Sequence, residues 1–450
     1  MATVFLVILV LGLLVFRQNI VVLLLAVTAY IHMVWGDGQI EYLVEDMWIS
    51  LSSEALLSIP MFLIAGNIMT QGAIAQRLIR IMVLISGPLP GGMGVATILS
   101  CAIFAAISGS SPVTLLAVGT ILYPALLEQG YHKRFALGAI TAGGTLGIVI
   151  PPSIPLIIYG LATEQSISDL FVAGVVPGLV LTAALAAYSL WTNRHLPSKR
   201  FDLRAFAAAL REGIWSLLLP FILLGGIYSG YFSATEAAAV ALLYALFVEV
   251  VIHRELGLAD FRDTTISTAR MLGMLFPIIA VALSLKSLLT IMRVPHELTE
   301  WVTEFTTNKV MFLVLVNLLL LLVGCFFDVI SAILILAPLL LVPAMSYGID
   351  PIHFGVMMVI NLEIGFLTPP IGLNLFVATT AFREKFSEIC LSVLPFMALI
   401  VGLIACVEGL KVEGSSESLG RHTTMSVVKA IFLVIVVDGL FAMFFAAIGV

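Results

Sequence analysis

Charged residues are scarce in this 450-residue sequence: they make up 11% of it, against 61% hydrophobic residues, and the mean hydropathy is +1.16. A soluble domain with this composition is excluded, because most of its surface would be apolar. Apolar runs of the roughly 20 residues needed to cross a membrane recur from end to end. Strands of alternating polarity are missing, which excludes an outer-membrane barrel. The sequence therefore predicts an all-α polytopic membrane protein.

Signals for enzymatic chemistry are also missing. The few cysteines lie in or beside apolar runs without the spacing of metal ligands, which favours a packing role; they are Cys101, Cys325, Cys390 and Cys406. There is no G-x-x-x-x-G-K-[ST] phosphate loop and no G-x-S-x-G nucleophile elbow, and the stretch HELTE at His296 lacks the second histidine of a zinc protease. We therefore expect no enzyme, no bound cofactor and no nucleic-acid partner.

The apolar runs give the candidate membrane spans. The run at 3–34 is interrupted at Arg17–Asn19 and lacks the features of a cleaved signal peptide, so we interpret it as a retained span. Two runs, 92–128 and 310–347, are too long for one crossing and are broken near the middle by polar residues. Each predicts a helical hairpin or re-entrant loop, whose backbone needs protein or water around it. The other runs are 57–75, 135–160, 168–192, 214–230, 236–252, 268–291, 352–380, 386–407 and 425–449.

Two stretches repeat the pattern G-x-x-x-P-P at a fixed offset. Gly147 precedes Pro151–Pro152 as Gly365 precedes Pro369–Pro370, and a polar-broken apolar run precedes each copy. The shared order of hairpin, turn, helix and Pro-Pro break indicates two related halves.

Basic residues give the orientation of the two halves. The connection 194–213 contains five Lys or Arg residues, and the turn 128–135 contains two, so both are predicted to be cytoplasmic. The counterpart of that turn in the second half, 346–354, is acidic and has no Lys or Arg, so it is predicted to be periplasmic. Equivalent turns on opposite sides indicate inverted repeats. Inverted repeats with paired broken helices are typical of secondary transporters with a binding site at the membrane midplane.

The breaks supply oxygen ligands. Two adjacent prolines inside a helix remove two amide donors and leave backbone carbonyls free one turn earlier. Hydroxyl groups lie at or near both breaks and hairpin tips: Ser108, Ser110, Ser111, Thr145, Ser153 and Thr368. Together they suit a small dehydrated cation such as sodium. The alternative is a kink solvated by neighbouring helices, but two repeat-related breaks that face polar hairpins favour ion sites.

Several ionisable residues lie at membrane depth, where they are costly and usually functional or paired. Asp328 lies at the tip of the second hairpin, which favours a binding role. Glu363 precedes the second break, and a structural role as acceptor for freed backbone N–H groups is favoured there over a ligand role. Glu236 follows Ser233 at the start of a span, which indicates helix capping. Lys286 is central in its span and is open to pairing with an acid or an anionic substrate.

These motifs resemble the large membrane subunit of a tripartite ATP-independent periplasmic (TRAP) transporter. The resemblance spans most of residues 1–400 and is strongest at Ile59–Ile79, Gly91–Thr114, Gly143–Gly160, Gly230–Leu246 and Asn361–Ala378. It implies a sodium-driven importer of small organic anions of the carboxylate class, multi-pass in the bacterial inner membrane and working as an elevator. It also implies two partners, a small membrane (Q) subunit and a periplasmic substrate-binding protein.

The resemblance also implies a set of binding residues. Carried over by motif, the substrate- and ion-binding residues are Ser108, Gly109, Ser110, Ser111, Thr145, Gly147, Pro151, Asp328, Ser331, Asn361, Gly365, Thr368, Pro369 and Asn374. Sodium is expected at Ser110, Gly147, Asp328, Gly365 and Thr368. Asn361 and Asn374 flank the second break and are expected to contact the substrate. Hydroxyl and amide donors, with the positive ends of half-helices, fit an anion.

The expected organisation has four segments. The first half is 1–193 with the broken helix 144–160, a cytoplasmic basic linker follows at 194–213, and the second half is 214–410 with the broken helix 361–378. The tail, 411–450, departs from the TRAP pattern by adding a span at Met425–Val450. Its stretches 413–424 and 433–441 resemble the C-terminal end of an MlaE-type permease. That resemblance leaves open an alternative function, the permease subunit of an ATP-driven phospholipid transport system.

Overall fold

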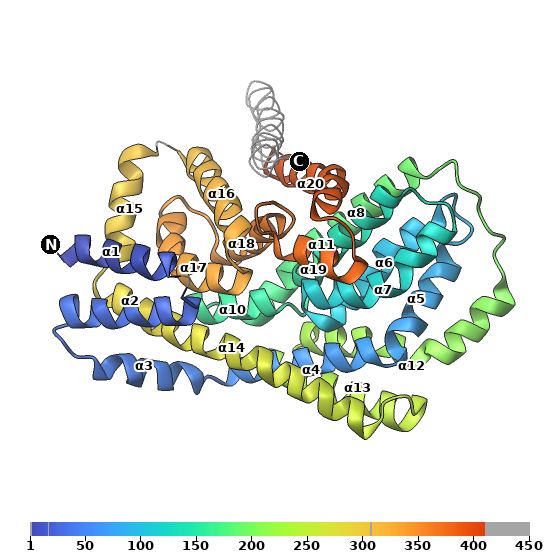
Figure 1. Cartoon of the computed structure of the whole chain (residues 1–450), viewed down its shortest axis with the longest axis horizontal. Coiled ribbons are helices and arrows are strands. Elements are labelled where there is room, and N and C mark those ends of the chain that lie inside the picture. The colour runs from blue at the N-terminus through green and yellow to red at the C-terminus, as the bar shows by residue number, and fades with distance from the viewer. Residues whose placement is uncertain (1, 17, 307, 410–450) are drawn as a thin grey trace.

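The computed structural model describes residues 2–16, 18–306 and 308–409, and all regular elements within them are helices (Figure 1). In this part of the chain, eight helices are long and apolar enough to cross a membrane, or nine if the bent pair Glu41–Leu51 and Glu54–Gln71 is counted as one span. The predicted all-α polytopic fold is confirmed. The predicted span at Met425–Val450 lies outside the described residues.

The N-terminal run was predicted as one interrupted span, and this prediction is wrong. It forms two helices, α1 (Ala2–Val15) and α2 (Ile20–Trp35). The chain reverses direction between them, as shown by the hydrogen bond from the Tyr30 hydroxyl in the second half of α2 to the Ala2 carbonyl at the start of α1. Asn19 ends the break by accepting a hydrogen bond from the backbone N–H of Val21, as an N-cap residue does.

A layer of helices lies along the lower side of the molecule in Figure 1. Its longest member is α14 (Leu258–Ile291), which packs against α2, α3 (Glu41–Leu51) and α4 (Ser58–Gln71). In turn, α4 packs against α13 (Ala234–Phe247), which continues into the short π-helical turn η2 (Val248–His253). We call α2, α3, α4, α13 and α14 the α14 layer.

Both long broken runs form two helices, as predicted. The first hairpin consists of α6 (Gly92–Ser108) and α7 (Ser111–Glu128). The second consists of α16 (Lys309–Phe326) and α17 (Val329–Ser346). The register of the repeat is exact at these helices: α7 and α17 each have 18 residues, and 329 minus 111 gives the same offset, 218, as 365 minus 147.

Both Pro-Pro stretches interrupt a helix. In the first half the chain runs through α8 (Lys133–Gly144), the single turn α9 (Leu146–Val149) and α10 (Ile154–Thr163). In the second half it runs through α18 (Pro351–Phe366) and α19 (Leu373–Phe382). The predicted broken helices are therefore confirmed. The peptide bonds Pro151–Pro152 and Pro369–Pro370 are both cis.

The remaining helices connect these parts. Long spans α11 (Ile167–Thr192) and α12 (Leu203–Tyr228) join the two halves, and α20 (Phe386–Gly409) follows the second break. Two short helices, α5 (Ala73–Ser86) and α15 (Val294–Phe305), precede the two hairpins and pack against α6 and α17, respectively.

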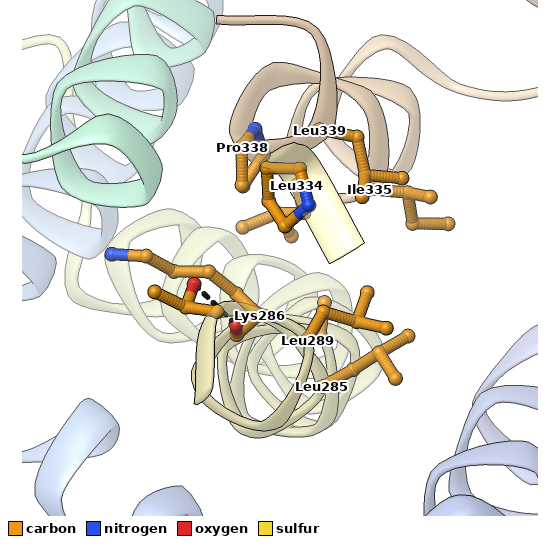
Figure 2. A pocket seen from close by; sticks show the side chains of 10 residues that line it. Leu285, Lys286, Leu289, Leu334, Ile335, Pro338 and Leu339 are labelled. Atoms are coloured by element: carbon orange, nitrogen blue, oxygen red, sulfur yellow. Dashed lines mark hydrogen bonds between the residues drawn. The ribbon is translucent and has the colours of Figure 1, made fainter. Parts of the chain in front are cut away.

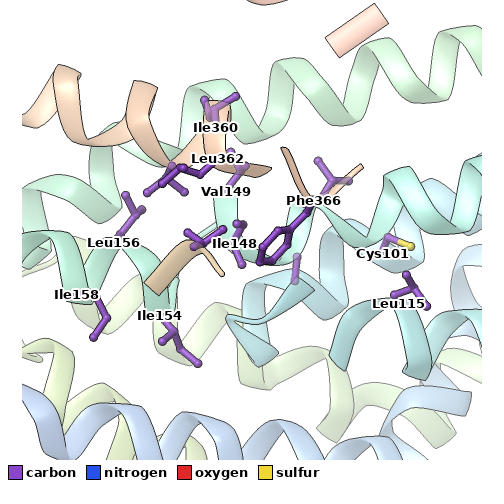
Figure 3. Packing of buried hydrophobic residues seen from close by; sticks show 14 of the residues in the cluster. Cys101, Leu115, Ile148, Val149, Ile154, Leu156, Ile158, Ile360, Leu362 and Phe366 are labelled. Atoms are coloured by element: carbon purple, nitrogen blue, oxygen red, sulfur yellow. The ribbon is translucent and has the colours of Figure 1, made fainter. Parts of the chain in front are cut away.

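The core lies where the broken helices meet. Ile148 and Val149 of α9 lie beside Ile360, Leu362 and Phe366 of α18 (Figure 3). All five side chains are buried. Pro151 and Pro152 of the first break are also buried, whereas the second break is buried at Pro369 and exposed at Ile371. The first break is therefore enclosed by protein, which is the condition under which non-helical backbone is tolerated at membrane depth.

Candidate functional site at the helix breaks

The tip of the first hairpin is a two-residue turn between α6 and α7. Gly109 adopts a left-handed conformation with φ +61°, and a Cβ atom there would lie 2.9 Å from the Pro152 carbonyl oxygen. Its carbonyl accepts a hydrogen bond from the Ile154 N–H of α10 at 3.2 Å. Ser108 Oγ lies 2.8 Å from Thr114 Oγ1. The tip is thus held against the first break by backbone contacts that leave no room for a side chain at residue 109.

Gly147, which precedes the first break, contacts the same hairpin tip. A Cβ atom on Gly147 would lie 2.6 Å from the Ser110 carbonyl oxygen and 2.7 Å from Thr114 Oγ1. The Thr145 hydroxyl donates to the Ala142 carbonyl, one turn back in its own helix. The structure therefore places Gly147 and Ser110 together, as the sequence predicted, with Pro151 and Thr145 in the adjoining turns.

The tip of the second hairpin ends at Asp328. Its carboxylate accepts hydrogen bonds from the backbone N–H groups of Ile330 at 3.1 Å and Ser331 at 3.0 Å, so it caps the N-terminus of α17. The Ser331 side chain is fully buried. Within the described residues its hydroxyl has no hydrogen-bond partner. Asp328 occupies the repeat position of Ser110, whose side chain makes no capping hydrogen bond to α7.

The second break packs on the second hairpin through glycine. A Cβ atom on Gly365 would lie 2.5 Å from the backbone of Gly324, so α18 and α16 touch main chain to main chain. Past the break, the Gly372 N–H donates to the Cys325 carbonyl at 3.4 Å. The buried Thr368 hydroxyl, directly before Pro369, donates to the Ile364 carbonyl at 2.8 Å. Each break therefore faces the tip of its own hairpin.

Four helix N-termini come together at these breaks. Those of α7 and α10 are joined by the hydrogen bond between Gly109 and Ile154. Those of α7 and α19 are joined across the two halves, because Asn374 Nδ2 donates to Ser111 Oγ at 2.6 Å. The start of α19 is joined to the last turn of α16, next to the tip that leads into α17, because the Gly372 N–H donates to the Cys325 carbonyl. Several N–H groups at these ends already have protein acceptors, such as that of Ile154 on Gly109 and those of Ile330 and Ser331 on Asp328. The helix N-termini still carry partial positive charge, which favours an anion nearby.

A buried carboxyl group lies beside two of these N-termini. Glu363 Oε1 accepts hydrogen bonds from Ser111 Oγ at 2.9 Å and from Asn374 Nδ2 at 3.4 Å. We call Ser111, Glu363 and Asn374 the Glu363 cluster. The sequence interpretation of Glu363 as an acceptor for backbone N–H groups is not what the structure shows, since both donors are side chains. Asn361 lies apart from the cluster's contacts and donates to the Met357 carbonyl at 2.9 Å.

Two other predicted pairings are resolved. Glu236 and Ser233 form a capping box at the start of α13, as predicted. Lys286 pairs with an acid: its Nζ atom lies 2.7 Å from Glu164 Oε1 at the end of α10. Lys286 also lines a small pocket of about 10 Å³ between α14 and α17, in which Leu285 and Leu289 face Leu334 and Pro338 (Figure 2).

Fold and site together define a class: a polytopic helical membrane protein whose two hairpins and two broken helices enclose a site suited to an anion. The chain belongs to the family described as the DctM component of the tripartite ATP-independent periplasmic transporters, whose model matches residues 3–410. It is thus a multi-pass protein of the bacterial inner membrane and no enzyme. The match ends where the atypical tail begins, and nothing supports the resemblance of that tail to a phospholipid permease.

The similar proteins described here align with most of this chain. The chain is 44% identical to the C4-dicarboxylate TRAP transporter large permease protein of Pseudomonas aeruginosa, over 78% of this chain and 83% of that protein. It is 40% identical to the isethionate TRAP transporter permease protein DctMQ of Oleidesulfovibrio alaskensis, over 82% of this chain but only 59% of that longer protein. The YdaH transporter of Alcanivorax borkumensis has the same fold, with a TM-score of 0.57 at 14% identity over 86% of this chain and 87% of that one.

Proposed function

We propose that this chain imports a small organic anion together with sodium ions. The observation that carries the proposal is the meeting of four helix N-termini at two repeat-related breaks. Two similar proteins are named for anions, a C4-dicarboxylate and the sulfonate isethionate. Carboxylate and sulfonate share a negative charge and several acceptor oxygens, which is what free N–H groups and helix N-termini recognise.

The proposed sodium sites use the two breaks and the two hairpin tips. At the first, the Ser110 carbonyl lies against Gly147. At the second, we propose Thr368, the carbonyls around Gly365 and Asp328 of the hairpin tip as the ligands. Hard oxygen ligands of this kind suit small cations. No group of three or more His, Cys, Asp or Glu side chains able to hold a metal occurs in the described residues. The ligands proposed are main-chain and hydroxyl oxygens, with the single carboxylate of Asp328 at the second site.

We further propose that the hairpins and broken helices move as one body against the α14 layer, as in an elevator. The two parts touch through α4 on α6 and through α14 on α17. The contact at α14 and α17 contains the pocket beside Lys286 (Figure 2), and the ion pair of Lys286 with Glu164 joins the same two parts. The ion pair is partly exposed, so it is inexpensive to break.

Two partners are proposed from the family. They are a small membrane (Q) subunit and a periplasmic substrate-binding protein. The similar permease protein DctMQ is longer than this chain, and its name joins M and Q. A longer relative whose name joins M and Q supports the proposal that this chain works with a separate Q subunit.

The test is uptake into proteoliposomes that contain this chain, its small membrane subunit and its periplasmic binding protein. Radiolabelled succinate and isethionate are the probes, with an inward sodium gradient or with choline in place of sodium. We expect uptake of at least one anion, dependent on both the sodium gradient and the binding protein. Uptake at the same rate in choline would refute sodium coupling.

A matched pair of variants tests the second sodium site. Thr368 and Thr379 each donate to the carbonyl four residues earlier, at 2.8 Å and 2.7 Å, but only Thr368 lies at the break. We expect Thr368→Val to raise the half-saturating sodium concentration about tenfold, equivalent to about 1.4 kcal/mol. Thr379→Val removes the same local hydrogen bond and is expected to leave that concentration unchanged. Equal behaviour of the two variants would contradict a sodium ligand at Thr368.

A further inference from the structure

A second pocket lies at the base of the first hairpin, at the opposite end of α6 from the hairpin tip. It has a volume of about 180 Å³ and is bounded by α5, the start of α6, the turn between α7 and α8, and the connection that follows α11. Its polar side chains are Gln129, Tyr131 and Lys199, and we call it the Lys199 pocket. Because α6 has 17 residues and is about 25 Å long, this pocket is separate from the site at the breaks.

The walls of the Lys199 pocket are held together by main chain. The backbone N–H of Lys199 donates to the Gly87 carbonyl at 2.8 Å. Gly91 has a left-handed conformation with φ +65°, and a Cβ atom there would lie 2.6 Å from the Asn193 carbonyl oxygen. The connection after α11 therefore lies directly on the turn between α5 and α6, and the pocket between them belongs to the fold.

The polar side chains of the pocket are donors without recorded acceptors. Tyr131 is 6% exposed, and its hydroxyl oxygen accepts from the Gly94 N–H at 3.2 Å. Within the described residues, the hydroxyl hydrogen of Tyr131, the Gln129 amide and the Lys199 ammonium have no recorded protein partner. The donors that face the pocket are therefore side chains, since the Gly94 N–H of α6 is already used.

The charge of the lining is positive. Lys199 contributes an ammonium group, and no Asp or Glu occurs among the lining residues, all of which belong to the described part of the chain. The neighbouring basic residues differ in this respect, because Lys133 pairs with Glu384 and Arg134 pairs with Glu388. A ligand with a negative charge and several acceptor oxygens would satisfy the unused donors.

The pocket lies at the level of the membrane surface. Three candidate spans end or begin beside it: Ser111–Glu128 ends, Lys133–Thr163 begins and Ile167–Thr192 ends. Trp191, in the last turn of α11, is 68% exposed, and exposed tryptophan is typical of the membrane–water interface. The connection that carries Lys199 is the basic one predicted to be cytoplasmic. The ligand is therefore expected among the headgroups of that leaflet.

We propose that the Lys199 pocket binds the headgroup of an anionic phospholipid. The phosphate would accept from the Lys199 ammonium, and the remaining headgroup oxygens from Tyr131 and Gln129. The pocket is smaller than the roughly 300–1,000 Å³ of sites that enclose a drug-sized molecule, so it holds a headgroup while the acyl chains stay in the bilayer.

The apolar walls favour a lipid over free phosphate. Val83, Met93 and Leu196 line the same pocket as the donors. Inorganic phosphate would satisfy the donors but would leave these side chains without an apolar partner. The glycerol and first methylene groups of a phospholipid contact both kinds of wall, and basic residues at the membrane surface attract anionic lipids.

This site does not depend on the proposed transport function. Its walls come from the base of the first hairpin and from the connection after α11, so a bound headgroup would join these two parts of the chain. A ligand that binds only the folded state stabilises it. We therefore expect anionic lipid to raise the unfolding temperature of the protein.

The test is lipid binding by the purified full-length chain after removal of lipid in detergent. Intact-protein mass spectrometry measures the dissociation constants of dioleoyl-phosphatidylglycerol, dioleoyl-phosphatidylcholine and the soluble probe glycerol 3-phosphate. We expect one saturable phosphatidylglycerol site, with weaker binding of phosphatidylcholine and of glycerol 3-phosphate. The unfolding temperature should rise with phosphatidylglycerol.

Three variants locate the site. Lys199→Gln is expected to raise the dissociation constant for phosphatidylglycerol about tenfold, because it removes a charged hydrogen bond. Gln129→Leu is expected to raise it about threefold. The matched control is Lys385→Gln, an exposed lysine without a recorded side-chain partner in the described residues and next to Glu384, which pairs with Lys133. It should bind as the wild type does.

The outcomes that would overturn the proposal are distinct. Equal dissociation constants for Lys199→Gln and Lys385→Gln would show that the lipid is not held at this pocket. Equal binding of phosphatidylcholine and phosphatidylglycerol would refute the preference for an anion. Binding of glycerol 3-phosphate as tight as that of the lipid would assign the pocket to a soluble phosphate. Unfolding temperatures of the variants without lipid, expected to match the wild type, separate lost binding from lost folding, and no uptake is measured.

Discussion

The glycine contact between α16 and α18 makes a quantitative prediction for Gly365→Ala. The new Cβ atom would lie 2.5 Å from the Gly324 backbone, and the two helices must separate by about 0.9 Å to reach the ordinary contact distance of 3.4 Å. Because the opposing atoms are main chain, no side chain can rotate away. Overpacking of a buried contact costs about 1–3 kcal/mol. Alanine in a helix recovers about 1 kcal/mol relative to glycine.

The control isolates the packing cost from helix propensity. Gly273 lies inside α14 with nothing within 4 Å of its added Cβ atom, so Gly273→Ala receives the helix gain alone. The difference in unfolding free energy between the two variants should therefore be about 1–3 kcal/mol. Thermal unfolding of the purified complex, followed by tryptophan fluorescence, measures it. If Gly365→Ala is as stable as Gly273→Ala, the close contact of α16 with α18 is wrong.

Two more substitutions test individual contacts of the site and its border. Asp328→Asn keeps a capping oxygen for α17 and should preserve the unfolding free energy, whereas Asp328→Ala should lower it by about 1 kcal/mol. If the Asp328 carboxylate is a sodium ligand, both variants should need a higher sodium concentration for uptake. An unchanged sodium requirement would mean that Asp328 only caps α17. Burial acts to raise the pKa of Glu384, but hydrogen bonds from Lys133 and Tyr123 outweigh it and lower that pKa. Its contribution to stability should be complete above the unfolded pKa of about 4.3 and be lost as the pH falls through the lower folded pKa. Thermal unfolding of Glu384→Gln should lack this acid-dependent loss, and parallel curves for variant and wild type would contradict it.

Hydropathy and proline spacing were sufficient to predict the hairpins and the two breaks, because both signals are local. Three helices were not predicted: α3, α5 and α15. They are short and partly charged, as Arg77 and Arg80 in α5 illustrate. Their stability comes from packing on neighbouring elements, which a single-sequence pattern does not contain.

The sequence also could not predict which side chains form hydrogen bonds or ion pairs across the two halves. Glu363 and Ser111 are 252 residues apart in the chain, and Lys286 and Glu164 are 122 apart. The sequence showed that a carboxyl group lay beside a break, but its donors depend on how the first hairpin meets the second broken helix. The fold-back of α1 on α2 was missed for a related reason. A polar break between two apolar runs is compatible with a kink or a reversal, and the Tyr30 contact with Ala2 that decides between them is tertiary.

The two halves share a backbone but differ in the side chains at equivalent positions. Asp328 stands where the first half has Ser110, and Glu363 where it has Thr145. The shared backbone supplies what both breaks need, namely carbonyl oxygens and helix N-termini, so those features follow from the repeat itself. The two carboxyl groups both belong to the second half. On the proposed function, the first break would bind its cation through neutral oxygens alone. The second would add a negative charge at the hairpin tip, where Asp328 caps α17. Cation affinity is therefore expected to differ between the two breaks, because only the second has a carboxylate at its hairpin tip.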